Sequence, residues 1–416
     1  MKEVIKSGVS PFLLAIIFLI PLQNIYLGKI PSFGGGVNIL NILMVFALIW
    51  ACSITDTNFT NTLNKYIFAM IVFYIIAWAR AGNYIGAYDP NSLNELKDIF
   101  FGYLMFFVVF KICKTLPQLK RVFLATLLPL PYMFKVYYTN LSWMGFSHYS
   151  DKLRLNGGTF MGLGSNEINA FYSTYTFVLL AVAITRTNRW KKYSFLVLAS
   201  MNIYCVIYGF SRGAYIAGIV GLVVFAYLTS KMKLLIGSLL LLITISVIGA
   251  QILPKATVER FDMSFTNEEN MDTSAKARID NWDLAMKLFY NNPILGIGYG
   301  NFKKVNPSGL DTHNYYIKIL VENGVFGFIA LLLFFKACWR KIFELRSIAT
   351  DPFLKAVAIG MIPCIISLMI GNLFGDRFTY YPLISYFYVY MAIVLRGIDL
   401  SKMYKEKFKS MQVTYG

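Results

Sequence analysis

The sequence contains few charged residues. Asp, Glu, Lys and Arg make up 14% of the 416 residues, whereas hydrophobic residues make up 57%. A soluble domain carries about 25% charged residues, because its surface faces water. A chain with so few charges cannot cover a water-facing surface, so we expect most of its surface to face lipid.

Other absences exclude several kinds of chemistry. The sequence has no Gly-x-x-x-x-Gly-Lys loop, which argues against a nucleotide-driven step, and no Asp-x-Asp pair to hold a divalent cation. It has two histidines, His148 and His313, whereas a zinc site needs three or four His, Cys, Asp or Glu ligands. We therefore expect neither a metal nor another cofactor.

Long apolar runs fill most of the chain. They are continuous, as in membrane helices, and do not alternate as barrel strands would. Backbone in lipid must be hydrogen-bonded internally, so the sequence predicts an all-α polytopic membrane protein with about twelve transmembrane helices. The predicted segments are 9–28, 37–54, 64–80, 98–113, 118–137, 165–185, 192–210, 213–229, 234–252, 314–335, 353–374 and 380–396.

Prolines interrupt two of these segments. Pro129 and Pro131 lie in the middle of segment 118–137 and should kink it. Segment 9–28 follows a basic start, as in a signal peptide, but no small-residue cleavage site follows it and Pro21 interrupts it. We expect this segment to be a retained membrane anchor.

The net charge of +18 lies mainly on one predicted side of the membrane. The basic runs 111–121, 186–192, 336–346 and 396–409 all fall on the side of the N-terminus. Loops rich in Lys and Arg face the cytoplasm, so we expect both termini there. The positive charge is spread over short loops, so it indicates orientation and no nucleic-acid partner. The five cysteines lie in apolar segments or cytoplasmic loops, and no disulfide is expected.

Two predicted outer segments are long, 138–164 and 253–313. Long connections usually carry function. We therefore divide the chain into N-terminal helices (1–137), a core that holds both long segments (138–336), and C-terminal helices with a basic cytoplasmic tail (337–416).

One histidine directly precedes the tenth apolar segment. His313 stands in Asp-Thr-His-Asn-Tyr-Tyr, and Gly324 and Gly327 follow it. Eleven residues of continuous helix would bring Gly324 to nearly the same face about three turns below, where small residues let a neighbouring helix pack closely. His313 would then sit at a fixed height near the outer boundary; the alternative is a histidine that only bonds a loop carbonyl.

Four arginines lie at predicted outer positions. Arg212 stands in a very short turn, Arg154 and Arg278 in the two long segments, and Arg80 at the end of a span. A guanidinium presents a planar fork of donors to phosphate and keeps its charge. Together with His313, these arginines suggest a lipid phosphate or diphosphate held at this boundary. Taken singly, each could instead be a snorkelling or loop-capping side chain.

In this combination the chain resembles the O-antigen ligase and O-antigen polymerase superfamily of bacterial envelope glycosyltransferases. The resemblance runs from about residue 154 to residue 327. Four blocks in order carry it: Arg154-Leu155-x-Gly157 with Asn166 following; Ser211-Arg212-Gly213-Ala214; Arg278-x-x-x-Trp282 with Asn292-Pro293-x-x-Gly296-x-Gly298; and His313-Asn314 with Gly324-x-x-Gly327.

The resemblance implies a GT-C-like, metal-independent, inverting enzyme that acts on undecaprenyl-diphosphate-linked glycans at the periplasmic face of the bacterial inner membrane. His313 would be the general base for the acceptor hydroxyl, since a neutral imidazole suits that role. Arg212 and Arg278 would be the catalytic cations that neutralise the departing diphosphate. The diphosphate or glycan would be bound by Arg154, Arg80, Asn166 and Asn314.

The acceptor separates the alternatives. An O-antigen ligase transfers the polysaccharide to lipid A-core, and a polymerase transfers it to a second lipid-linked repeat unit. Many polymerases have two large outer loops, whereas here only segment 253–313 reaches about sixty residues. The histidine block also has the ligase form, so we favour a ligase. A protein O-oligosaccharyltransferase shares the histidine block. A polysaccharide-lipid transporter is the alternative of another class, and it would need ionisable residues in mid-span.

Overall fold

The computed structural model describes residues 9–26, 38–54, 62–86, 90–144, 158–160, 164–230, 255, 258–259 and 273–415. Across these residues every regular element is a helix, and no strand is present. The ninth predicted apolar segment (234–252), Arg154 and His148 lie outside the described residues.

The helices follow the predicted apolar segments. Five of them are long and apolar enough to cross a membrane: Leu63–Ile85, Ser165–Thr185, Tyr315–Ile348, Pro352–Gly371 and Tyr381–Lys407. Three shorter helices are also apolar: Pro11–Ile25, Ile39–Ser53 and Arg212–Leu228. The all-α membrane architecture is therefore confirmed, and the count of twelve spans stays a prediction.

The elements have the following bounds: α1 Pro11–Leu19, η1 Ile20–Leu22, α2 Gln23–Tyr26, α3 Ile39–Ser53, α4 Thr62–Ile85, α5 Pro90–Ile112, α6 Leu116–Leu127, α7 Leu130–Met144, α8 Ser165–Thr185, α9 Arg189–Ile207, α10 Arg212–Leu228, α13 Thr273–Asn291, α14 Phe302–Val305, α15 Tyr315–Ile348, α16 Pro352–Gly371, η4 Arg377–Thr379 and α17 Tyr381–Tyr415.

Prolines end helices where the sequence predicts an interruption. The predicted fifth span is two helices, because α6 ends at Leu127 and α7 begins at Leu130, on either side of Pro129. Proline has no N–H to donate and its ring clashes with the preceding turn. In the first segment, α1 ends at Leu19 and a 3₁₀ turn that contains Pro21 follows.

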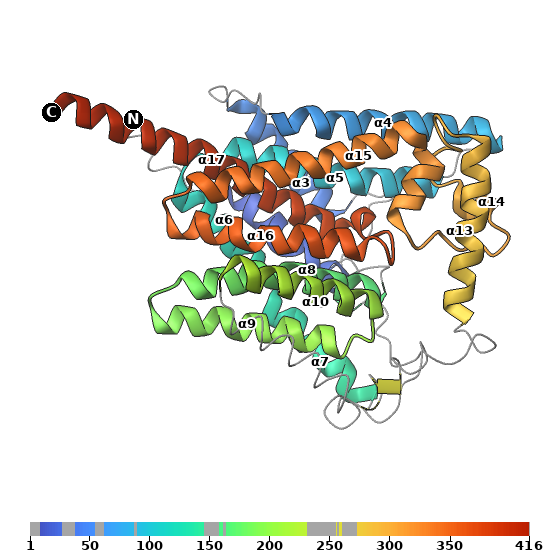
Figure 1. Cartoon of the computed structure of the whole chain (residues 1–416), viewed down its shortest axis with the longest axis horizontal. Helices are drawn as coiled ribbons and strands as arrows, with labels where there is room; N and C mark the ends of the chain where they lie inside the picture. Colours follow the sequence, from blue (N-terminus) through green and yellow to red (C-terminus); the bar gives the residue numbers. More distant parts are fainter. Residues whose placement is uncertain are drawn as a thin grey trace.

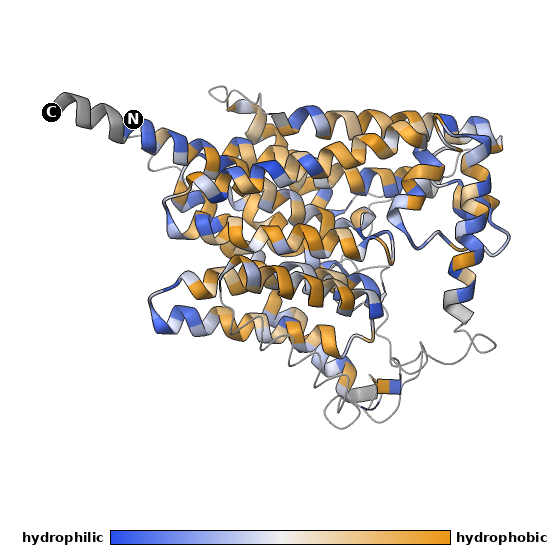
Figure 2. Cartoon of the chain, viewed as in Figure 1, coloured by the Kyte–Doolittle hydropathy of each residue, from blue (hydrophilic) through white to orange (hydrophobic). Residues whose placement is uncertain are grey.

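The long helices lie alongside one another in a bundle, and α13 crosses one end of it (Figure 1). Hydrophobic residues colour the middle of the bundle, and hydrophilic residues gather toward its two ends (Figure 2). Helix α16 packs against α8, α10 and α15. Its approach to α8 is close, because a Cβ on Gly360 would lie 2.6 Å from the Cα of Val178.

Helix α15 is broken at Gly324. This residue has φ 71° and ψ −173°, a conformation essentially restricted to glycine. The break leaves backbone groups unpaired within the helix, and buried backbone groups must find partners. The backbone N–H groups of Ile297 and Gly298 donate to the carbonyls of Val321 (2.9 Å) and Glu322 (3.0 Å). The N–H of Val325 donates to the carbonyl of Pro293 at 2.8 Å.

Residues 292–298, which we call the inserted loop, therefore fill the break in α15. The predicted continuous helix from His313 past Gly324 is wrong, and so is the expectation that another helix packs on Gly324. A Cβ at this glycine would lie 2.1 Å from the carbonyl oxygen of Ile294 in the inserted loop. The glycine is required because the loop backbone approaches so closely.

A second helix holds the inserted loop from its other side. Arg80, in α4, donates from Nε to the carbonyl of Gly296 (2.6 Å) and from Nη2 to Oδ1 of Asn292 (3.2 Å). Asn301 donates from Nδ2 to the carbonyls of Ala81 (3.0 Å) and Ile297 (2.8 Å). These bonds fix the inserted loop between α4 and α15.

Replacement of Gly324 by alanine tests this fit. Backbone strain alone at such a position costs about 1–3 kcal/mol. We expect Gly324→Ala to destabilise the protein by more than this, because the new Cβ also collides with Ile294. Gly309→Ala is the matched control: Gly309 has φ +67°, but no atom lies within 4 Å of its Cβ position. Thermal unfolding of both variants in detergent measures the difference, and equal losses of stability would contradict the inserted loop.

Candidate functional site

His313 lies directly before α15, at the end of the bundle that α13 crosses. Its φ of 51° is left-handed, which costs a side-chain-bearing residue about 1–2 kcal/mol. Its side chain is half-buried. The contacts around His313 must therefore stabilise this backbone conformation.

Asn314 caps α15. Its side-chain oxygen accepts hydrogen bonds from the backbone N–H groups of Tyr316 (3.0 Å) and Ile317 (3.3 Å). Asparagine is one of the best N-cap residues because it pairs N–H groups that the helix leaves unsatisfied. Thr312 Oγ1 also bonds the carbonyl of Asn314 at 3.0 Å. Asn314 thus orients the residue before it, whereas its predicted role in substrate binding stays a prediction.

Helix α13 docks on the segment that precedes His313. Trp282 donates from Nε1 to the carbonyl of Thr312 at 2.8 Å, and Asn281 donates from Nδ2 to the carbonyl of Asp311 at 3.3 Å. Residues four apart lie on one face of a helix, so Arg278 shares the face of Trp282. This explains the spacing of Arg278 and Trp282 noted in the sequence.

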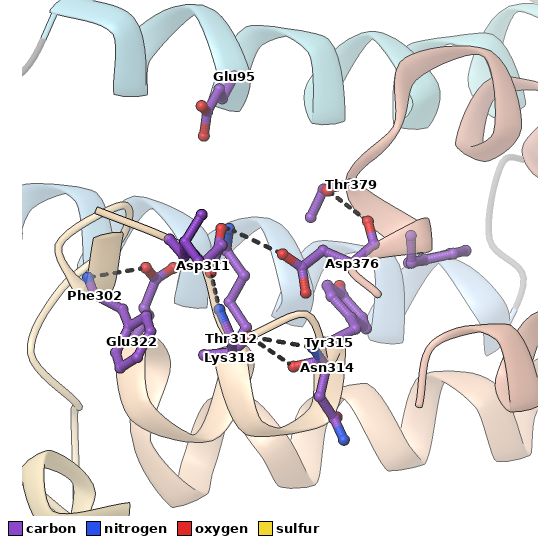
Figure 3. Close-up of polar contacts among 12 residues, drawn as sticks. Glu95, Phe302, Asp311, Thr312, Asn314, Tyr315, Lys318, Glu322, Asp376 and Thr379 are labelled. Atoms are coloured by element: carbon purple, nitrogen blue, oxygen red, sulfur yellow. Dashed lines mark hydrogen bonds and ion pairs between the residues drawn. The ribbon is translucent and has the colours of Figure 1, made fainter. Parts of the chain in front are cut away.

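A buried lysine joins two loops next to His313. Lys318, in the first turn of α15, pairs with Asp311 and, at 3.6 Å, with Asp376 in the turn between α16 and α17 (Figure 3). The side chains of Lys318 and Asp376 are each 7% exposed. Removal of one partner from a buried pair costs about 3–5 kcal/mol, because a charge stays buried without compensation. Lys318 therefore fixes both loops against α15.

The two carboxyl groups around Lys318 have different pKa values. Burial raises the pKa of Asp376 to about 7, and the negative charge of Asp311 adds to this shift. Burial also acts on Asp311, but Lys318 and the Thr312 N–H outweigh it and hold the pKa of Asp311 below its usual value. Asp311 is therefore the ionised partner of Lys318.

A second buried pair connects α8 to the same turn. Arg377 donates from Nη1 to Oε1 of Glu167 at 2.8 Å, and their side chains are 5% and 14% exposed. Glu167 stands one residue after Asn166 in the first turn of α8. Arg377 also lines a small cavity with Gly213, the residue after Arg212. The starts of α8 and α10 and the turn before α17 thus meet at one place.

Burial and nearby positive charges lower the pKa of His313. Burial of the imidazole is the largest cause, followed by the positive charge of Arg278. Arg377 acts in the same direction, while Asp311 and Glu167 oppose it. At neutral pH His313 is therefore uncharged and able to accept a proton.

The structure brings together some of the predicted site residues and places others elsewhere. His313 and Arg278 interact electrostatically, and Arg212 and Asn166 begin helices next to Arg377. Arg80 bonds the inserted loop, which gives it a structural role that the sequence did not indicate.

Sequence reasoning missed Glu167, Asp311, Lys318, Asp376 and Arg377 as parts of the site. One signal was available, since an ionisable residue such as Lys318 inside an apolar span is a functional candidate by default. Among the described residues no three His, Cys, Asp or Glu side chains are grouped to hold a metal. The predicted absence of a metal stays a prediction.

Comparison with known proteins bears on this arrangement. Residues 194–332 match the family described as O-antigen ligase. The resemblance to the O-antigen ligase superfamily is confirmed. The matched segment contains Arg212, Arg278 and His313, whereas Arg80, Arg154 and Asn166 precede it.

A curated relative aligns with part of the chain. It is an uncharacterized protein of Haemophilus influenzae, 32% identical over an alignment of 145 residues, and the match covers 30% of this chain and 36% of the relative. The alignment thus spans about a third of the length of that relative. The O-antigen ligase superfamily remains the more informative comparison.

The pKa of His313 can be measured directly, because the chain has only two histidines. NMR titration of histidine-labelled protein should give a pKa for His313 below 6.5, the usual value, with a His148→Gln variant to assign the signals. Arg278→Gln removes a positive charge and should raise this pKa, because protonation becomes less unfavourable.

Lys287→Gln is the matched control for the titration. It removes a cation from the same helix, nine residues further along the chain, and should change the pKa of His313 less than Arg278→Gln does. An unchanged pKa in Arg278→Gln would show that Arg278 does not act on His313.

Proposed function

We propose that this protein is an inverting, metal-independent glycosyltransferase of the O-antigen ligase type. It transfers a polysaccharide from undecaprenyl diphosphate to lipid A-core at the periplasmic face of the inner membrane, and both of its termini lie in the cytoplasm. The proposal rests on His313, which is uncharged and half-buried and lies near Arg278 and Arg377. His313 and Arg278 lie within the segment that matches the family, and Arg377 lies beyond it.

The chemistry follows from these groups. His313 accepts the proton of the acceptor hydroxyl, and the oxygen attacks the anomeric carbon. The bond between that carbon and the diphosphate oxygen breaks on the opposite face, so the anomeric configuration inverts. Arg278 and Arg212 neutralise the charge that develops on the departing diphosphate, and cations in a poorly solvated site do so strongly.

The charge distribution supports the proposed orientation. The basic runs 186–192 and 336–346 lie at the ends of α8 and α15 that are remote from His313. Hydrophilic residues mark that end of the bundle in Figure 2. Since loops rich in Lys and Arg stay in the cytoplasm, His313 would lie on the periplasmic side.

Two alternatives differ from this proposal in testable ways. A polymerase would use the same donor and the same residues but a second lipid-linked repeat unit as acceptor. A transporter would need ionisable groups in mid-span, whereas the buried Lys318 and Glu322 lie in the first two turns of α15 and contact Asp311 and the N–H of Phe302. This placement favours an enzyme over a transporter.

A transfer assay with the purified protein tests the function. Undecaprenyl-diphosphate-linked polysaccharide is offered with lipid A-core or with a second repeat unit, and product is expected only with lipid A-core. His313→Ala should lower the transfer rate by about 10²–10⁴-fold, the usual contribution of a general base, and leave donor binding largely intact.

The control for this assay is Lys303→Ala, which removes an exposed cation of the same outer segment and should transfer normally. Retained transfer by His313→Ala would contradict its role as the base. Product formed only with the second repeat unit would identify a polymerase, and no product with either acceptor would contradict the enzymatic proposal.

A further inference from the structure

A large cleft lies at the end of α15 remote from His313. It has a volume of about 740 Å³, within the range of ligand sites in proteins. Helix α15 lines it from Leu333 to Ser347, and Tyr66 of α4 also lines it. Leu333, Ala337, Arg340, Glu344 and Ser347 recur three or four apart and share one face of the helix, and the other lining residues of α15 flank that face.

The cleft is lined by both apolar and basic residues. Leu333 lies nearest the middle of α15, and the cations Lys336, Arg340 and Lys341 lie further toward its C-terminal end, with Ala337, Trp339, Phe343 and Glu344 among or beyond them. A membrane lipid has the same polarity, with hydrocarbon toward the bilayer centre and a head group outside it.

The length of α15 places these cations at head-group depth. The helix has 34 residues, which at about 1.5 Å per residue extend about 50 Å. About 20 residues cross the hydrocarbon, so a span that begins at Tyr315 leaves the hydrocarbon near Phe335. Lys336 and Arg340 therefore lie among phosphate groups.

Two of the cations are available to an anion. Glu344 pairs with Lys341 (2.7 Å) and with Lys402 of α17 (2.7 Å), so its negative charge is already compensated. Within the described parts of the chain, Lys336 and Arg340 form no ion pair, and both are exposed. Trp339 packs against Phe343, with ring centroids 4.9 Å apart and ring planes tilted by 38°.

We propose that this cleft binds the phosphate head group of an anionic phospholipid, in the leaflet opposite His313. Lys336 and Arg340 hold the phosphate, and Leu333 and Ala337 contact the upper acyl chain. Basic pockets between membrane helices recognise anionic lipids in this way. Basic residues that only set the orientation of the protein in the membrane need no cleft. Here Tyr66 of a second helix lines a cleft together with α15, which distinguishes this site from such residues.

Native mass spectrometry of the full-length protein tests the site. In detergent, the protein should retain one phosphatidylglycerol at least tenfold more tightly than phosphatidylcholine with the same acyl chains. Each cation near a phosphate surface is worth about fivefold in affinity, so Lys336→Ala with Arg340→Ala should weaken phosphatidylglycerol binding about 25-fold and abolish the preference.

Lys191→Ala with Lys192→Ala is the matched control. This variant removes two exposed cations at the start of α9, and neither residue lines the cleft. The preference for phosphatidylglycerol should therefore persist. Glycerol 3-phosphate is added as a competitor at the lipid concentration and should not displace the lipid.

Three results would overturn the proposal. One is an unchanged preference after Lys336→Ala with Arg340→Ala, and another is an equal loss in both double variants. The third is displacement by glycerol 3-phosphate, which would identify a soluble phosphate ligand instead of a lipid. None of these results depends on the transferase activity.

Discussion

The structure depends on the pairing of backbone groups at the break in α15. Hydrocarbon offers no water to backbone N–H and C=O groups, so an interrupted membrane helix needs partners from elsewhere in the protein. The inserted loop supplies them: Ile297 and Gly298 donate to α15, and Pro293 accepts from it. Gly324 permits this contact because it alone provides the space and the backbone conformation.

The position of His313 follows from this contact. The inserted loop comes directly after α13, so fixing the loop in α15 also fixes the end of α13. The middle of α13 then reaches the segment before His313 through Trp282 and Asn281. Lys318 ties the same segment to Asp376. Contacts thus connect α15 to the inserted loop, α13 to the segment before His313, and that segment back to α15. They hold the histidine in place although it lies outside the regular helices.

Much of the helical framework could be predicted from the sequence, because apolar runs and prolines act locally. The break between α6 and α7 lies at Pro129, as the sequence predicts. The sequence also singles out Arg212, Arg278 and His313, and all three lie within the segment that matches the family. The break at Gly324 could not be predicted, because a glycine in a membrane helix indicates close packing by a helix as readily as by a loop. The pair of Arg377 and Glu167 joins residues 210 positions apart, and no periodicity in a single sequence reveals such a pair.

Hydrogen exchange measured on peptides is the most direct test of the inserted loop. We predict that a peptide covering residues 294–299 exchanges as slowly as one from the interior of α15. The N–H groups of Ile297 and Gly298 are bonded to that helix, the N–H of Tyr299 is bonded to α4, and the N–H of Gly296 is bonded within the loop. The exposed turn at residues 307–310, whose N–H groups bond only to residues within or next to the same turn, is the internal reference for faster exchange. If residues 294–299 exchange as fast as that turn, the inserted loop does not fill the break in α15, and the positioning of His313 derived from it is wrong.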